Sequence, residues 1–274
     1  AIGDASIITG ETPTVTVVLS EAATLFAAAD IACASGSLGS ISVAGDGVTW
    51  TGTFTPTADT DDNSNTCVVG TSWTDSAGNA PEAGQTSANY AVDTAAPTSS
   101  WTSISDTSLI EGETATLTVV ISETTHSGFT NADITCANGA VAALNVAGDG
   151  VTYTGVFTPT AEVEDGSNTC VIGTGWTDTA GNSGVGSTSS NYAIDGVDPV
   201  LSNIVMSTSN SNSGLAKSGD TITLTITASE AVSALVCTID GEATTMGGSG
   251  TGWTSALTLS GDETEQNTVF SCAS

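Results

Sequence analysis

Six cysteines are the most reactive side chains in this sequence, and they fall into three pairs. The members of a pair are 34, 34 and 35 residues apart: Cys33 and Cys67, Cys136 and Cys170, Cys237 and Cys272. This regular spacing predicts three disulfides and an oxidising compartment. Buried free thiols are the alternative. No C-x-x-C motif or neighbouring histidine accompanies the pairs, which argues against a zinc site.

Carboxylates recur at fixed places and are candidate ligands for a hard cation. Each is the glutamate of a Ser-Glu pair, the aspartate of a Thr-Asp-x-Ala-Gly-Asn motif, or an aspartate shortly before a proline at a repeat junction. The candidate metal ligands are Glu21, Asp75, Asp93, Glu123, Asp178, Asp195, Asp198 and Glu230. Carboxylate oxygens together with backbone carbonyls and water suit calcium. Asp30 and Asp133 are predicted either to join such a site or to cap the strand that follows.

The overall charge limits the classes of partner. Thirty acidic residues stand against a single basic one, Lys217, for a formal net charge of −29. Such a chain repels phosphate backbones and anionic lipid headgroups, so we expect no nucleic-acid partner and no membrane insertion of this segment. A merely soluble or halotolerant surface is the alternative explanation for most of these acids.

An internal repeat defines the organisation of the chain. The segment 169–182 (TCVIGTGWTDTAGN) closely matches the segment 66–79 (TCVVGTSWTDSAGN). We therefore predict repeat 1 at 1–97, repeat 2 at 98–199 and a repeat 3 at 200–274 that is incomplete at its C-terminus. Proline residues close both junctions, which predicts short, semi-rigid linkers. We also expect the chain to be a segment of a longer protein.

Alternating polar and apolar residues predict strands within each repeat. In repeat 2 we expect seven, at 101–105, 114–122, 132–137, 141–146, 151–158, 169–177 and 189–194. The Ala-Gly-Asp-Gly segments at 44–47 and 147–150 predict tight hairpin turns. The predicted fold class is all-β, with tandem immunoglobulin-like antiparallel β-sandwiches of seven strands each. Each disulfide would join the third strand to the sixth, unlike the second-to-sixth bridge of antibody domains.

This layout predicts where the acids meet. Loops at one pole of a sandwich follow its second and sixth strands, so Glu123, Asp178 and Asp93 should converge where repeat 2 meets repeat 1. The opposite pole of repeat 1 carries Asp59, Asp61 and Asp62 on a predicted loop. Facing acidic poles would repel unless a divalent cation neutralised them. Solvated loops and repeats that splay apart are the alternative.

Chemistry for catalysis is not evident. The single histidine, His126, is interpreted as an exposed residue of a loop, and no Ser-His-Asp or Cys-His set forms around it. Carboxylate pairs lie at predicted loop poles rather than in a cleft, which gives a glycosidase little support. Trp50, Tyr153 and Trp253 share one strand position and are predicted to pack rather than to bind sugar. We therefore expect no enzyme activity.

Several motifs together resemble the tandem bacterial Ig-like repeats of large extracellular adhesins and biofilm-associated proteins. They are the Asp-Thr-Ala-Ala-Pro junction, the Gly-Glu-Thr turn, Phe-Thr-Pro-Thr-Ala at 54–58 and 157–161, and Thr-Asp-x-Ala-Gly-Asn. The resemblance implies an extracellular stalk, stiffened by calcium between its domains. The cysteine pairs and the near absence of lysine depart from that pattern, and repeat 3 lacks Phe-Thr-Pro.

From these observations we expect a structural segment of a cell-surface adhesin, filament or surface-layer protein, with structural calcium as its cofactor. Its expected partners are further copies of the repeat or subunit, with a surface glycan or protein receptor bound outside this segment. The alternative is a spacer module of a secreted enzyme or carbohydrate-binding protein. Assembly into a polymer through the acidic faces is a third reading. The missing ends of the chain would discriminate among them.

Overall fold

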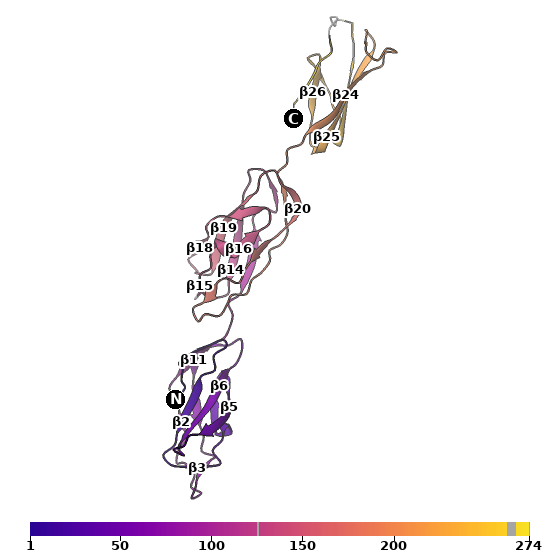
Figure 1. The fold of residues 1–274 in the computed structure, drawn as a ribbon. Helices are drawn as coiled ribbons and strands as arrows, with labels where there is room; N and C mark the ends of the chain where they lie inside the picture. The colour runs from indigo at the N-terminus through magenta and orange to yellow at the C-terminus, as the bar shows by residue number, and fades with distance from the viewer. Residues whose placement is uncertain (125, 262–266, 274) are drawn as a thin grey trace. The chain divides into compact units, whose positions relative to one another are not determined.

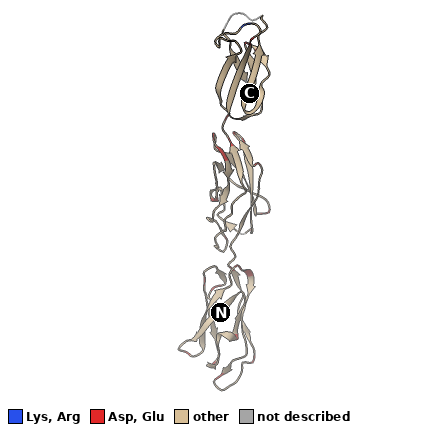
Figure 2. Cartoon of the chain, turned by 90° about the vertical axis from the view of Figure 1, so that its right-hand side faces the viewer, with Lys and Arg blue, Asp and Glu red and all other residues tan. Residues whose placement is uncertain are grey.

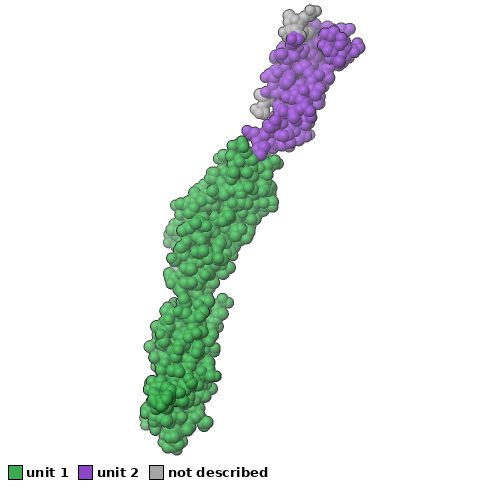
Figure 3. Space-filling model, viewed as in Figure 1, with its two compact units in different colours: residues 1–196 green, residues 197–274 purple. Residues whose placement is uncertain are grey.

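The computed structural model describes residues 1–124, 126–261 and 267–273, and it is built from β-strands. Figure 1 traces three sandwiches along the chain. The chain separates into two compact units, residues 1–196 and 197–274, which Figure 3 colours green and purple. The first unit holds repeats 1 and 2, each with its own hydrophobic core, and the second holds repeat 3.

Repeat 1 contains eleven strands and one 3₁₀ turn. They are β1 (Ser6–Ile8), β2 (Thr14–Val18), β3 (Ala23–Thr24), η1 (Ala28–Asp30), β4 (Ile31–Cys33), β5 (Gly36–Val43), β6 (Thr49–Pro56), β7 (Asp61–Asn65), β8 (Cys67–Val69), β9 (Thr74–Asp75), β10 (Gln85–Thr86) and β11 (Tyr90–Asp93).

Repeat 2 follows the same plan. Its elements are β12 (Ser99–Ile104), β13 (Ser108–Ile110), β14 (Ala115–Ile121), β15 (His126–Ser127), η2 (Asn131–Asp133), β16 (Ile134–Cys136), β17 (Gly139–Val141), β18 (Asn145–Val146), β19 (Thr152–Pro159), β20 (Glu164–Asn168), β21 (Cys170–Ile172), β22 (Thr177–Asp178) and β23 (Tyr192–Asp195).

Repeat 3 forms two sheets in the described residues, with orders β24-β25-β28 and β27-β26-β29. Its strands are β24 (Leu201–Thr208), β25 (Thr221–Val232), β26 (Val236–Ile239), β27 (Glu242–Thr244), β28 (Gly247–Thr258) and β29 (Phe270–Ala273).

Strand alternation builds each core. In β14 the side chains of Ala115, Leu117, Val119 and Ile121 are buried, while Thr116 between them is exposed. Inside the sandwich, Phe157 of the neighbouring strand β19 meets Tyr192 of β23 in the other sheet, in edge-to-face contact at 5.1 Å between ring centroids. The predicted all-β class with tandem Ig-like sandwiches is confirmed.

The topology departs from the predicted strands in several places, and two of these departures lie at the pole where the linker leaves. A short strand precedes the second predicted strand and pairs in parallel with the last one, as β1 with β11 and β13 with β23. The acids at 61–62, predicted to lie in a loop, belong instead to β7, which pairs antiparallel with β11, and those at 164–165 belong to the equivalent β20, which pairs with β23. The last strand is thus held on both edges at the pole where the linker leaves.

The tight turns before β6 and β19 form as predicted. Gly47 and Gly150 adopt φ values of 73° and 74°, a region that favours glycine. In the first turn, the Asp46 carboxylate accepts hydrogen bonds from the backbone of Val48 and Thr49 and from the Thr49 hydroxyl. These bonds lower the pKa of Asp46, with the Thr49 hydroxyl as the largest cause.

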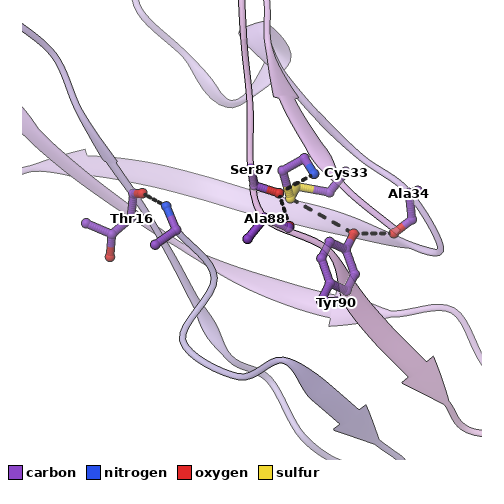
Figure 4. Close-up of a disulfide and its surroundings, with 8 residues drawn as sticks. Thr16, Cys33, Ala34, Ser87, Ala88 and Tyr90 are labelled. Atoms are coloured by element: carbon purple, nitrogen blue, oxygen red, sulfur yellow. Dashed lines mark hydrogen bonds between the residues drawn. A yellow bond between two sulfur atoms is a disulfide. The ribbon is translucent and has the colours of Figure 1, made fainter. Parts of the chain in front are cut away.

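All three predicted disulfides are present, one in each sandwich. Each joins directly paired residues of neighbouring strands, as Cys33 and Cys67 do on β4 and β8. Figure 4 shows the Tyr90 hydroxyl beside this bridge, donating to the carbonyl oxygen of Ala34. Tyr192 makes the same bond to the carbonyl of Ala137 in repeat 2, and burial raises its pKa to about 12. Disulfide and tyrosine thus fix one layer of each of these two sandwiches.

Candidate functional site: the joint between repeats 1 and 2

The loop at 178–182 forms a closed turn around one carboxylate. Asp178 ends β22, and its Oδ1 and Oδ2 accept hydrogen bonds from the backbone and side-chain nitrogens of Asn182, both at 2.8 Å. Gly181 permits this turn with a φ of 94°. Asp178 is only 2% exposed and Asn182 only 5%. The Asp-x-x-Gly-Asn sequence therefore specifies a loop that is closed by its own hydrogen bonds.

The same asparagine reaches across to repeat 1. Its Nδ2 lies 3.0 Å from the carbonyl oxygen of Asp93 and 3.1 Å from the Oδ1 of that residue. The backbone nitrogen of Thr9 donates to Asn182 Oδ1 at 3.4 Å. Beside these bonds, Ile8 Cδ1 lies 4.0 Å from the position that a side chain on Gly181 would occupy. We call this set of contacts between Thr9, Asp93 and Asn182 the joint.

The linker is anchored to repeat 1 by Thr94, which is buried although polar. Its hydroxyl donates to the carbonyl of Thr57 at 2.7 Å and accepts from the backbone nitrogen of Thr60 at 3.0 Å. The Thr9 hydroxyl in turn donates to the carbonyl of Thr94. On the far side, the backbone nitrogen of Val185 donates to the carbonyl of Pro97. Both ends of the linker are therefore held by hydrogen bonds.

Electrostatics at the joint favour a proton or another positive group. Burial, followed by the charges of Asp178 and Asp61, raises the pKa of Asp93, and only the Ala95 backbone and Asn182 oppose the shift. In repeat 1, the backbone and side-chain nitrogens of Asn79 donate hydrogen bonds to the Asp75 carboxylate in an equivalent turn. These hydrogen bonds lower the pKa of Asp75, and the bond from the Asn79 side chain is the largest cause. Both equivalent aspartates are buried, but only Asp178 acts on Asp93 across the joint.

The predicted acids meet only in part. Asp93 and Asp178 come together at the joint as predicted, bridged by a neutral amide. The Glu123 carbonyl accepts from His126, whose strand pairs with β22 next to Asp178. Figure 2 shows acidic segments in red against largely tan sheets, including one near the upper end of the middle sandwich.

The remaining predicted ligands lie in other settings. Glu21, Asp195 and Asp198 are exposed, and Glu230 lies within β25, which continues to Val232. Across the residues that the structure describes, no group of three His, Cys, Asp or Glu side chains is placed to hold a metal ion. Asp30 and Asp133 cap the 3₁₀ turns, which agrees with the capping alternative.

His126 is not the exposed loop residue that the sequence indicated. Its Nε2 lies 2.6 Å from the hydroxyl oxygen of Tyr153, and its Nδ1 lies 2.7 Å from the Glu123 carbonyl. Because a carbonyl only accepts, Nδ1 carries the proton and, in the neutral ring, Nε2 accepts from Tyr153. The ring also contacts Trp176 edge-on, at 6.3 Å between centroids. His126 is therefore a packing residue that supports the strand carrying Asp178.

Sequence reasoning missed the residues that make the joint, Asn182, Thr9 and Thr94. Asn182 is the last residue of the Thr-Asp-x-Ala-Gly-Asn motif, but the sequence analysis assigns a role only to the aspartate of that motif. Thr94 lies in the Asp-Thr-Ala-Ala-Pro junction and has no counterpart in the second junction, where Gly196 follows Asp195. That difference was the available signal.

The repeated sandwiches and their disulfides define a class: tandem immunoglobulin-like modules. The sequence matches the bacterial Ig-like domain family over residues 1–92 and 93–194. The chain therefore belongs to that family, and repeats 1 and 2 are two of its domains.

Two multi-domain chains are among the solved structures that match this chain. The I9-I11 tandem from titin is 11% identical with a TM-score of 0.33, over 94% of this chain and 87% of that one. The full extracellular region of plexin A4 is 9% identical with a TM-score of 0.26, over 98% of this chain and 31% of that one. Comparison with curated proteins found no match. In the described residues, no helix has the length and apolar character needed to cross a membrane.

Proposed function

We propose that this chain is a structural segment of an extracellular, repetitive cell-surface protein, such as an adhesin, filament or surface-layer protein. Its work is mechanical: it holds other parts of the protein at a distance. The observation that carries the proposal is the joint, because a specific set of hydrogen bonds between consecutive repeats has a purpose only in a tandem array. A disulfide in each sandwich supports an oxidising, extracellular location.

A mechanical role predicts how the chain lengthens under load. In each sandwich the disulfide closes a loop of 34 or 35 residues, which cannot extend while the bridge is intact. At roughly 3.3–3.6 Å per residue, reduction should add about 115 Å to the extension released when one repeat unfolds. Single-molecule stretching of the whole chain, with and without reductant, measures this gain. Unfolding lengths that do not respond to reductant would contradict the proposal that the disulfides limit extension.

Location is tested separately. On intact source cells, a membrane-impermeant amine or carboxyl label and an antibody against the native chain should both reach this segment. Labelling that requires cell lysis would contradict the extracellular placement while leaving the mechanical measurement standing.

Calcium remains a separate prediction, and no other step depends on it. Its support is that the charges of Asp178 and Asp61 both act on Asp93 and add to burial, the largest cause of the raised pKa of that residue. The described residues do not form a three-carboxylate cage, so an ion there would need water and backbone oxygens as further ligands. Calorimetric titration of the chelated chain with calcium tests the idea. Absence of binding heat, together with small-angle scattering unchanged by chelator, would remove calcium from the account.

A further inference from the structure

The bonding groups of Asn182 recur on Asn79 of repeat 1. The Asn79 backbone nitrogen donates to Asp75 Oδ1 at 2.8 Å and its Nδ2 donates to Asp75 Oδ2 at 2.7 Å, the same closed turn as in repeat 2. Asn182 uses its second Nδ2 proton and its Oδ1 at the joint. In the described part of the chain, the corresponding groups of Asn79 have no hydrogen-bond partner, and Asn79 is exposed.

Space for an incoming side chain is also conserved between the two loops. Gly78 adopts a φ of 92°, against 94° for Gly181. A Cβ atom at Gly181 would lie 4.0 Å from Ile8 of the preceding repeat. A Cβ atom at Gly78 would have no atom of the described chain within 4 Å. The loop of repeat 1 therefore presents the same polar groups and the same small glycine surface that repeat 2 uses at the joint.

We propose that the 75–79 loop of repeat 1 is a docking site for the linker end of another Ig-like repeat. The partner fits by chemistry: its last strand ends in an aspartate whose carboxylate and carbonyl bond to Asn79 Nδ2. Its neighbouring turn supplies a backbone N–H to Asn79 Oδ1 and an isoleucine above Gly78. In repeat 1 itself, Ile8, Thr9 and Asp93 form such an end. This inference rests on the proposed function as a tandem array.

A neutral amide makes this contact tolerable between two acidic groups. Asp75 is mostly buried and already accepts three hydrogen bonds, from Ala77 and from both nitrogens of Asn79. An incoming aspartate meets the remaining N–H of Asn79 before it meets that carboxylate, as Asp93 does at Asn182. An aspartate at position 79 would instead place two or three carboxylates together.

The test adds a repeat in the correct register. Ile2 pairs with Val15 as Ile104 pairs with Leu117, so Ala1 corresponds to Ser103. Residues 1–102 fused directly before Ala1 of the full chain therefore recreate the junction. Exchange of the Asn79 side-chain amide protons, followed by NMR, should slow by at least about tenfold relative to the original chain. Asp93→Ala in the added copy should reverse the effect.

Asn182 serves as the internal control, because its joint is present in both chains. An Asn79 amide that exchanges equally fast in both chains, while Asn182 stays protected, would overturn the docking site and leave the array intact. Fast exchange at Asn182 as well would instead contradict the joint on which the proposed function depends. Asn79→Asp in the extended chain should separate the added repeat from repeat 1, and the same substitution in the original chain measures what it costs the turn around Asp75 alone.

Discussion

The linker ends of repeats 1 and 2 have the same strand arrangement but different anchors. In repeat 1 Thr94 is buried and its hydroxyl holds the loop ahead of β7. In repeat 2 the corresponding residue is Gly196, whose backbone nitrogen donates to Val163 but which has no side chain to bond further. Thr9 of the first turn corresponds to Glu111 in the second. A shared fold thus carries two different linkers.

The exposed fractions of the side chains at the two linker ends differ in the same way. Ile8 is half-buried, whereas Ile110 at the same place in repeat 2 is 55% exposed. Asp93 is half-buried and Asp195 is exposed. The comparison teaches that an acidic strand end is common to both repeats, whereas the hydroxyl anchor of Thr94 belongs to repeat 1 alone.

The largest expected effect comes from removing the amide at the joint. Asn182→Ala leaves the buried Asp178 carboxylate without its side-chain donor and ends the bonds to Asp93, which should lower the free energy of unfolding of repeat 2 by about 3 kcal/mol. Asn79→Ala is the matched control and should cost about 1 kcal/mol, since it breaks only the local turn. Denaturant unfolding of both variants measures the difference. Equal costs would mean that the joint contributes nothing.

Removing the anchor should have a smaller effect. Thr94→Val keeps the shape but leaves the backbone nitrogen of Thr60 without its acceptor, for an expected loss of about 1–2 kcal/mol. Hydrogen exchange at Thr60 reports the change directly, because its amide should lose protection. Unchanged exchange at Thr60 would show that the hydroxyl bond is not formed in solution.

A buried amide oxygen offers a stabilising change in repeat 1. Asn65 Oδ1 has no hydrogen-bond partner among the described residues, whereas the equivalent Asn168 Oδ1 accepts from Asn138 Nδ2 at 2.8 Å. Ser35 stands where repeat 2 has Asn138, and both adopt positive φ. Ser35→Asn should therefore raise stability by about 1 kcal/mol and Asn138→Ser should lower it by a similar amount. Melting temperatures that shift in the same direction for both variants would refute the hydrogen bond from residue 35 or 138 to the buried asparagine oxygen.

Grafting the first linker onto the second tests the comparison from the other direction. Gly196→Thr places a hydroxyl near Thr160 and Val163, with its Cβ 3.2 Å from the Val163 carbonyl oxygen, and Glu111→Thr removes a charge beside it. We expect a gain of about 0.5–1 kcal/mol in repeat 2, in part from the lost freedom of glycine in the unfolded chain. Differential scanning calorimetry measures it. A net loss would show that the crowding at Val163 is not relieved.

The pH response should separate the two aspartates. Because the pKa of Asp93 is raised, the folded joint binds its proton more tightly than the unfolded chain and gains stability as the pH falls through that pKa. Asp75, whose pKa is lowered, stabilises the fold above 3.8 and loses that contribution on further acidification. Carbon-13 titration should place Asp93 above 3.8 and Asp75 below it, and Asp178→Asn should reduce the shift of Asp93. The reverse order would contradict the burial of Asp93.

Pattern and spacing were enough to predict the repeats, the sandwich class and the cysteine pairs, because all three depend on local periodicity and on a copied register. The parallel pairing of β1 with β11 was not predictable in this way, since a three-residue strand has almost no periodicity of its own. At the joint, the sequence pattern indicated the acidic residues as ligands because of their charge. The decisive contacts came from neutral side chains, Asn182 and Thr94, whose importance depends on burial and on what faces them across two domains.

Rotational diffusion measured by nitrogen-15 relaxation tests the central claim most directly. If Thr9, Asp93 and Asn182 join repeats 1 and 2, both should tumble with one common diffusion tensor in the native chain, with or without chelator. Asn182→Ala should divide them into two independently reorienting bodies. Independent tumbling of repeats 1 and 2 in the unaltered protein would contradict the account.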